Sequence, residues 1–224
     1  MIYSPDTGSS KDPFSTKPSV EVLQADCREA VPKQGKFDLI FADPPFNIGV
    51  PYKDYDDRRD DFPQFMAEWL EVCWEACDGV MALHGPDDLV WHYLQAAHRL
   101  EMPRIAWLNW HYRFGQCRRT NWVDARCHCL VFAKHEKWTW NPDAVLVDSD
   151  RATTYGDRRI GDTANGGQRL PGTVWGVPSD GAYWGRVTGN SRERRKGHPN
   201  QLPEVYLERM IKAYTNPGDR VLDA

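Results

Sequence analysis

The chain has 224 residues, of which 41% are hydrophobic and 27% charged, a size and composition typical of one soluble domain with a small insert. Its formal net charge of −4 excludes a uniformly basic surface that would by itself indicate nucleic acid. No segment approaches the roughly 20 apolar residues that span a bilayer, and no apolar signal core begins the chain. We therefore expect a cytoplasmic location, no membrane partner, and free thiols at the six scattered cysteines.

Short apolar runs alternate with helical patterns over the first part of the chain. Residues 1–19 are polar and aperiodic, which predicts a disordered tail. In chain order, the patterns then predict strands over 20–26 and 36–43, a helix over 61–77, a strand over 79–85, a helix over 86–102, and strands over 104–110 and 125–134. This alternation predicts an α/β domain with a largely parallel sheet, whose first part spans 20–137.

The regular pattern is lost between 138 and 197, in a segment rich in Gly, Asp, Arg, Thr and Trp. A segment of this length without periodicity is uncommon inside a compact domain, so we interpret it as a functional insert. Regular patterns then return with a helix over 202–215 that has Pro203 in its first turn, a turn over 216–219, and a strand from Arg220.

The stretch FDLIFADPPFNIG, residues 37–49, ends an apolar strand in a carboxylate, two prolines and an aromatic ring. Ligands of open α/β sheets bind beyond the carboxyl ends of strands, where we expect Asp43. Asp43 and the carbonyl of Pro44 offer acceptors for both hydrogens of an amino group, while Phe46 offers a flat face to the attached ring. This combination suits the exocyclic amine of a nucleobase. For DPP alone, a turn without catalytic function is the alternative.

The same stretch resembles the catalytic motif of the amino-group DNA methyltransferases, which act on adenine or cytosine. A second match, HPNQLPEVYLERMIKAYTNPGDRVLD over 198–223, resembles the segment that leads into the cofactor loop of that family. LQADCREAVP (23–32) and GTVWGVP (172–178) also fit the family pattern. A catalytic motif that precedes the cofactor motif resembles the order of the circularly permuted β class.

The resemblance implies a Rossmann-like, S-adenosylmethionine-dependent methyltransferase sheet of the α/β class, circularly permuted, with target recognition in the irregular insert at 138–197. It implies that the target base is held by Asp43, Pro44, Pro45, Phe46 and Asn47. It implies that the cofactor S-adenosylmethionine contacts His198, Pro199, Asn200, Gln201 and Asp223, with Asp26 near its adenine side. The segment 198–224 is then the start of the cofactor-binding half.

Two features depart from the family pattern. Leu202 stands where the family usually has lysine, which removes one polar cofactor contact. The chain ends at Ala224, before the glycine-rich loop that the resemblance leads us to expect. We therefore expect a C-terminally truncated piece of the cofactor-binding half.

Double-stranded DNA is the partner that the resemblance implies, with the target base turned out of the helix to reach Asp43. Two basic clusters are candidates for phosphate contacts, and a solvated charged surface is the alternative for each of their members. The candidates are Arg113, Arg118, Arg119, Arg186, Arg192, Arg194, Arg195 and Lys196. The resemblance leaves open a homodimer and a restriction enzyme partner.

The leading hypothesis is a site-specific DNA methyltransferase that modifies the exocyclic amine of adenine, because Asp at the first motif position is the commoner adenine form in the family. Methylation of the cytosine amine uses the same chemistry and is the first alternative. Methylation of RNA or of a protein amide is the second. A truncated, inactive DNA-binding relic or split subunit is the third.

Two further patterns were considered as ligand sites. Cys127, His128 and Cys129 do not predict a metal site, because successive strand residues face opposite sides and no paired CxxC motif occurs. We therefore expect no metal. His84 closes a strand as Asp43 does and could line the same pocket, although a structural histidine is the commoner case.

Overall fold

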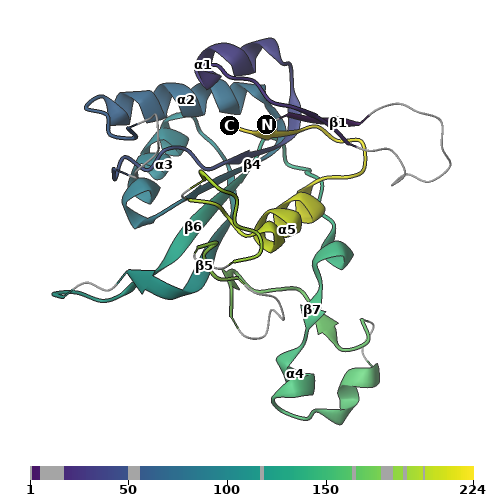
Figure 1. The fold of residues 1–224 in the computed structure, drawn as a ribbon. Coiled ribbons are helices and arrows are strands. Elements are labelled where there is room, and N and C mark those ends of the chain that lie inside the picture. Colours follow the sequence, from purple (N-terminus) through teal and green to yellow (C-terminus); the bar gives the residue numbers. More distant parts are fainter. Residues whose placement is uncertain are drawn as a thin grey trace.

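The computed structural model describes residues 2–5, 18–49, 56–116, 119–162, 165–177, 184–188, 191–198 and 200–224. Its centre is a mixed sheet of eight strands with helices on both faces (Figure 1), which confirms the predicted α/β class. Within these ranges, no helix combines the length and the apolar character needed to cross a membrane.

The strands of the main sheet follow the order β2-β1-β10-β3-β4-β6-β5-β9. They are β1 (Ile2–Pro5), β2 (Pro18–Glu21), β3 (Phe37–Ala42), β4 (Cys77–Gly85), β5 (Arg104–Gln116), β6 (Asp124–Ala133), β9 (Val174–Trp175) and β10 (Val221–Asp223). The central strands β10, β3 and β4 are parallel, whereas β6 pairs antiparallel with both β4 and β5. Because parallel strands end at the same edge of a sheet, β10, β3 and β4 bring their last residues together.

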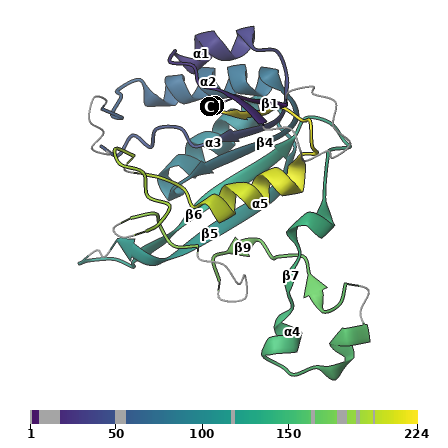
Figure 2. The ribbon, with the colours of Figure 1, turned by 45° about the vertical axis from the view of Figure 1, so that its right-hand side comes forward.

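Successive residues of the central strands point to opposite faces, and each face carries its own apolar core. Ile40 and Met81 pack in the core under α2 and α3, whereas Leu39 and Val80 pack in the core under α5. Figure 2 shows α5 on the face of the sheet opposite to α2. The helices are α1 (Cys27–Ala30), η1 (Val31–Lys33), α2 (Phe62–Ala76), α3 (Asp87–Arg99) and α5 (Glu204–Tyr214).

The three long helices lie where the periodicity of the sequence predicts them. The helices expected over 61–77, 86–102 and 202–215 are confirmed as α2, α3 and α5. Pro203 differs in one respect, because it occupies the N-cap position before the first helical residue rather than the first turn. Proline is tolerated at this end of a helix because the first N–H groups have no partner within the helix.

The predicted strand over 20–26 is wrong beyond Glu21, where β2 ends. Asp26 instead caps α1, since its carboxylate accepts a hydrogen bond from the backbone N–H of Arg28 at 2.9 Å. An aspartate at this position satisfies an N–H that the helix leaves free, so the capping contact outweighs the strand pattern. Residues 2–5 also differ from the expected disordered tail, because β1 pairs with both β2 and β10.

The insert over 138–197 contains short elements. They are η2 (Pro142–Val145), β7 (Val147–Asp148), α4 (Asp150–Thr153), η3 (Arg158–Asp162), β8 (Gln168–Arg169) and β9. β7 and β8 form a separate two-stranded sheet, which projects with α4 away from the main sheet (Figures 1 and 2). β9 then returns and pairs parallel with β5, so the insert is attached to the edge of the main sheet.

Candidate active site

Asp43 directly follows β3, at the edge where the parallel strands end. Its Oδ1 atom is buried and has no hydrogen-bond partner in the part of the chain that the structure describes. Burial raises the pKa of Asp43 well above its usual value, and the negative charge of Asp223 raises it further. A buried acceptor without a partner is unfavourable in a folded protein, which makes Asp43 a candidate for binding a hydrogen-bond donor of a ligand.

Asp223 ends β10, the neighbour of β3, and is paired in register with Phe41. The next residue, Ala224, donates its N–H to the carbonyl of Phe41 at 3.4 Å. Burial raises the pKa of Asp223, while nearby positive charge, including that of His198, lowers it. Asp43 therefore follows β3 and Asp223 ends the neighbouring strand β10. The negative charge of these two carboxylates at one edge of the sheet suits a cationic ligand.

The backbone after residues 43–47 is held by Asp57. This side chain is buried, and its two oxygens accept hydrogen bonds from the N–H groups of Ile48 and Gly49, at 3.2 and 2.7 Å. Gly49 has a φ of +77°, and a Cβ added there would meet the side chain of Arg58 at 2.6 Å. Asp57 therefore holds the backbone of Ile48 and Gly49, directly after residues 43–47, which restricts the position of Phe46.

Pro44 and Phe46 are buried, while Pro45 and Asn47 are half-buried. Asn47 has a φ of 58°, a left-handed conformation that asparagine tolerates better than most residues. Its side-chain oxygen accepts a hydrogen bond from the backbone N–H of Arg59 at 2.6 Å. Asn47 is thus a structural part of the loop, whatever contact it makes with a ligand.

His84 in β4 is buried next to the catalytic motif, with its ring centroid 6.4 Å from that of Phe46. Its Nδ1 atom lies 3.0 Å from the hydroxyl of Tyr206 on α5, and its backbone carbonyl accepts a hydrogen bond from the hydroxyl of Tyr93 at 2.7 Å. Burial lowers the pKa of His84 to about 3, with a further effect from His128. The ring is therefore neutral at physiological pH.

Tyr206 lies within an aromatic cluster that joins the insert to the sheet. Its ring centroid is 5.6 Å from that of Trp110 in β5 and 5.4 Å from that of Trp175 in β9. The indole N–H of Trp110 donates to the carbonyl of Trp184 at 2.6 Å, and the guanidinium of Arg209 lies 4.4 Å from the ring centre of Trp184. This packing fixes the end of the insert against α5.

A cleft of about 930 Å³ opens beside these groups. Its walls come from parts of the chain that are far apart in sequence, namely the catalytic motif, the β4–α3 junction, the β5–β6 hairpin, the end of the insert and the second family motif. The lining includes Phe46, His84, Trp110, Tyr112, Trp122, Arg186, Asn200 and Gln201. A cleft of this volume with aromatic walls and a few polar groups is typical of a ligand site.

Asp87, the first residue of α3, connects one wall of the cleft to the hairpin. Its carboxylate accepts hydrogen bonds from Arg126 at 3.2 and 2.9 Å and from Nε2 of His128. The indole N–H of Trp107 donates to Nδ1 of His128 at 3.0 Å, so a neutral His128 ring carries its hydrogen on Nε2. The hydrogen bonds from Arg126, and then from His128, lower the pKa of Asp87. In the described ranges, no group of three or more His, Cys, Asp and Glu side chains is arranged to hold a metal.

The second family motif reaches the cleft through Asn200 and Gln201, both half-buried. His198 is exposed, and Pro199 lies outside the described residues. Asp26 does not line the cleft, and its carboxylate pairs with Arg28 at 2.7 Å in addition to capping α1. The structure therefore brings two of the six predicted cofactor residues into the cleft and places Asp223 at the strand edge.

Gln201 also has a structural contact that the sequence does not reveal. Its amide donates to the carbonyl of Glu193 at 2.8 Å and accepts from the N–H of Arg195 at 3.0 Å. The carboxylate of Glu193 in turn accepts from the N–H of Glu204 at 2.9 Å, at the start of α5. This chain of bonds satisfies a free helix N–H and fixes the basic segment 192–196 beside α5.

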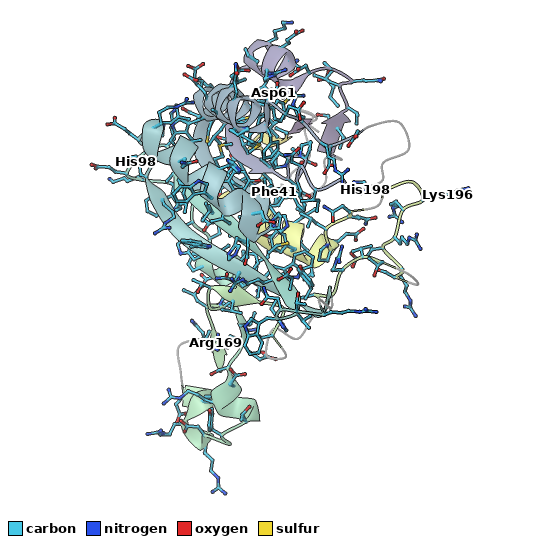
Figure 3. All side chains as sticks on the ribbon, turned by 90° about the vertical axis from the view of Figure 1, so that its left-hand side faces the viewer. Phe41, Asp61, His98, Arg169, Lys196 and His198 are labelled. Atoms are coloured by element: carbon cyan, nitrogen blue, oxygen red, sulfur yellow. The ribbon has the colours of Figure 1, made fainter. Side chains whose placement is uncertain are left out.

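The predicted DNA contacts fall into two settings. Arg186 is half-buried at the cleft, with its guanidinium 5.5 Å from the ring centre of Tyr112. The other candidates with described side chains are exposed, namely Arg119, Arg192, Arg194, Arg195 and Lys196. Lys196 points away from the body of the molecule (Figure 3). Arg118 and the side chain of Arg113 lie outside the described residues.

The sequence patterns do not single out three further residues of this region, namely Asp87, Trp110 and Tyr206. Trp110 and Tyr206 lie inside a strand and a helix, where their pattern indicates ordinary core packing. Asp87 lies in the first turn of a helix, where an acidic residue is expected for its effect on the helix dipole. No local signal distinguishes these three residues from structural ones.

Residues 37–224 match a family model described as DNA methylase. The chain belongs to this DNA methylase family. The resemblance to DNA amino-methyltransferases is thereby confirmed.

Two relatives of the chain have names that describe methyltransferases. The chain is 30% identical over 197 residues to the Type II methyltransferase M.HpaI of Haemophilus parainfluenzae, covering 85% of this chain and 58% of the relative. It is 30% identical over 209 residues to the DNA adenine methyltransferase YhdJ of Escherichia coli strain K12, covering 83% of this chain and 63% of the relative. The chain thus spans less than two thirds of the length of either relative.

Two solved structures share the fold of this chain. A crystal structure of an M1.HpyAVI–SAM complex has a TM-score of 0.51 at 16% identity, covering 88% of this chain and 76% of that one. The PvuII DNA methyltransferase (cytosine-N4-specific) has a TM-score of 0.58 at 12% identity, covering 89% and 71%. At these identities the likeness concerns the fold alone.

Proposed function

We propose that the protein carrying this chain transfers a methyl group from S-adenosylmethionine to the exocyclic amino group of adenine in DNA, at a specific site. The observation that carries the proposal is the buried Oδ1 of Asp43, which has no hydrogen-bond partner among the described residues and lies three residues before the cleft-lining Phe46. An amino group is a hydrogen-bond donor, which is the kind of partner that Asp43 Oδ1 lacks among the described residues. Family membership and the names of the two relatives support the same chemistry.

The chain's own residues would hold and orient the base. Asp43 accepts one amino hydrogen, the carbonyl of Pro44 accepts the other, and Phe46 packs on the face of the ring. Two acceptors draw the nitrogen lone pair out of conjugation with the ring, so the nitrogen becomes a better nucleophile. Asp43 also stabilises the positive charge that develops on this nitrogen, and most of the remaining catalysis is positioning.

The strand edge fits the charge of the proposed cofactor. When bound, S-adenosylmethionine supplies a methyl group on a cationic sulfur. Desolvation raises the pKa values of Asp43 and Asp223, and in Asp43 the neighbouring charge of Asp223 adds to the effect. A cation placed between them relieves this repulsion. We propose contacts to its amino-acid end from His198, Pro199, Asn200, Gln201 and Asp223, with Asp26 toward its adenine.

Double-stranded DNA is the proposed partner, and its target base must leave the stack to reach Asp43. Arg186 is the proposed contact nearest the base, because it lines the cleft itself. The proposed phosphate contacts are Arg113, Arg118, Arg119, Arg192, Arg194, Arg195 and Lys196. A restriction enzyme partner is a further proposal, which the name of the Type II relative M.HpaI supports. A homodimer is a separate proposal.

The test is methyl transfer from radiolabelled S-adenosylmethionine to unmethylated genomic DNA, followed by digestion to nucleosides and mass spectrometry. We expect N6-methyladenine from the wild type and a loss of at least about 100-fold in Asp43→Ala, since removal of one charge-stabilising contact has an effect of that order. Asp78→Asn is the matched control, because this exposed carboxylate lies at the opposite end of β4.

The products separate the proposal from its alternatives. N4-methylcytosine in place of N6-methyladenine would establish the cytosine alternative. Transfer to RNA or protein but not to DNA would overturn the choice of substrate. DNA binding without any transfer would favour a non-catalytic role.

A further inference from the structure

Trp122 is a large apolar side chain that the described residues leave uncovered. It is 89% exposed, more than any other large hydrophobic residue in the described ranges. Its backbone N–H donates a hydrogen bond to the side-chain oxygen of Asn121 at 2.8 Å. Tryptophan usually buries its ring, as Trp110 and Trp184 do here at 4% and 3% exposure. An indole presented in this way is suited to stacking on a partner.

The hairpin that carries Trp122 is long and firmly anchored. β5 and β6 pair from Arg104–Phe132 to Gln116–Asp124, and their hairpin projects from the main sheet (Figures 1 and 2). At the base of the projection, Arg126 is bonded twice to Asp87 on α3. The base of the hairpin is therefore joined to α3, and the exposed ring of Trp122 lies beyond this contact.

Trp122 lines the same cleft as Phe46. The ring proposed to receive a base and the exposed indole thus border one opening, although Phe46 follows β3 and Trp122 lies between β5 and β6, on the other side of β4. Asn121 and Val123 line the cleft beside Trp122, and Val123 is 52% exposed. Phe46 and this part of the hairpin therefore border one cleft.

The charge of the hairpin indicates which partner it meets. Between 113 and 126 the sequence holds four arginines and one aspartate, although the chain as a whole has a net charge of −4. Of the four, Arg126 is paired with Asp87 on α3. Arg119, three residues before Trp122, is exposed. An exposed indole among arginines is the combination used to stack on bases while cations contact phosphates. The complementary partner is duplex DNA.

We infer that Trp122 enters the DNA stack and occupies the space left by the target base when that base turns into the cleft. This inference rests on the proposed function for the identity of the partner. Removing a base from a duplex leaves its neighbours unstacked, and an inserted aromatic or apolar side chain restores part of the lost stacking. Trp122 is therefore a positioning residue, which favours the extruded state of the base without touching the reacting atoms.

The test measures affinity for DNA that already contains such a space. Binding of the full protein is followed by fluorescence anisotropy on a mixed-sequence duplex and on the same duplex with abasic analogues. We expect the wild type to bind the abasic duplex about tenfold more tightly, an effect of the size of one base–aromatic stack. Trp122→Ala should bring the ratio of the two affinities close to one, while Trp122→Phe should keep most of it.

The control is Trp91→Ala, which removes another exposed tryptophan, 63% exposed on α3 and outside the cleft lining. The ratio should be unchanged in this variant. The inference is overturned if the wild type shows no preference for the abasic duplex, or if Trp122→Ala retains that preference. It is also overturned if both alanine variants lose it equally.

A second readout separates this inference from the proposed function. Methyl transfer to duplex DNA should fall about tenfold in Trp122→Ala and stay unchanged in Trp91→Ala. If neither the wild type nor any variant transfers methyl groups, the proposed function fails. The preference for the abasic duplex then still decides the role of Trp122. If transfer occurs and Trp122→Ala matches the wild type in it, the inference fails and the proposed function stands.

Discussion

Asp43 and Asp223 lie at the ends of neighbouring parallel strands, and the charge of Asp223 adds to the burial that raises the pKa of Asp43. Each carboxylate is thus harder to ionise in the folded protein than in the unfolded chain. The strand order places this pair where a cationic group is proposed to bind. The unfavourable charge is a property of the folded state, so it can be measured through stability.

Asp43→Asn should stabilise the protein at pH 8. A carboxyl group whose pKa is raised by folding binds its proton more tightly in the folded state, so stability falls as pH rises from about 4 through the raised pKa. The asparagine side chain does not ionise, so the variant does not lose this stability. The loss in the wild type amounts to about 1.4 kcal/mol for each unit of pKa shift. Urea unfolding at pH 8, 6 and 4 should show a gain that shrinks toward pH 4. An equal gain at every pH would contradict the charge argument, and Asp78→Asn is the control.

His84→Gln should change the pH dependence of stability in the acid range. The folded state lowers the pKa of His84 to about 3, whereas an unfolded histidine titrates near 6.5. Between these two pKa values, the histidine binds a proton in the unfolded chain but not in the folded protein. The protein therefore loses stability as pH falls from about 6.5 toward 3.

In His84→Gln, this loss should be smaller by about 1.4 kcal/mol per pH unit, the contribution of one proton. Urea unfolding at pH 7, 5.5 and 4.5 measures it. The same replacement at His98, exposed on α3 (Figure 3), controls for loss of a histidine as such. Identical pH slopes in the wild type and His84→Gln would mean that the buried ring accepts a proton in the folded state.

Asn141→Ala should lower the free energy of unfolding by about 1–3 kcal/mol. The Asn141 amide donates to the carbonyls of Lys212 and Thr215, at 3.2 and 2.8 Å, and thereby satisfies free carbonyls at the C-terminal end of α5. Asn141→Asp should cost more, because a carboxylate repels these carbonyls and opposes the helix dipole. Thermal unfolding compares both with Asn165→Ala, which alters an exposed asparagine of the insert. Equal melting temperatures for all three would refute the capping role.

Gly176→Ala should destabilise the attachment of β9 by about 2–4 kcal/mol. Gly176 has a φ of +83°, and a Cβ there would lie 2.1 Å from the carbonyl oxygen of His111 in β5. Hydrogen exchange of the β9 amides should quicken, since β9 pairs with β5 at this point. Gly172→Ala is the matched control, because a Cβ there meets nothing within 4 Å. Protection of β9 that survives Gly176→Ala would show that the backbone adjusts without loss.

Local patterns located most of the regular structure, because helix periodicity and strand apolarity depend on nearby residues alone. The helices α2 and α3 and the strands β3 and β4 are confirmed close to their expected bounds. The strand expected over 20–26 failed because Asp26 makes a capping contact that an apolar run does not reveal. β1 could not be found by pattern, because its pairing partners β2 and β10 include the far end of the chain.

The sequence by itself determined the family, the position of Asp43 after a strand, and the chemistry that Asp43 and Phe46 suggest. These depend on residue types and their order. Only the tertiary structure decided that Asp43 Oδ1 is buried without a described partner, that Asp223 lies beside it, and that His84 is neutral behind Phe46. Burial and charge coupling arise from strand order and helix packing, which join residues far apart in sequence. For the same reason, the common cleft of Phe46, Trp122 and Asn200 emerges only after the chain has folded.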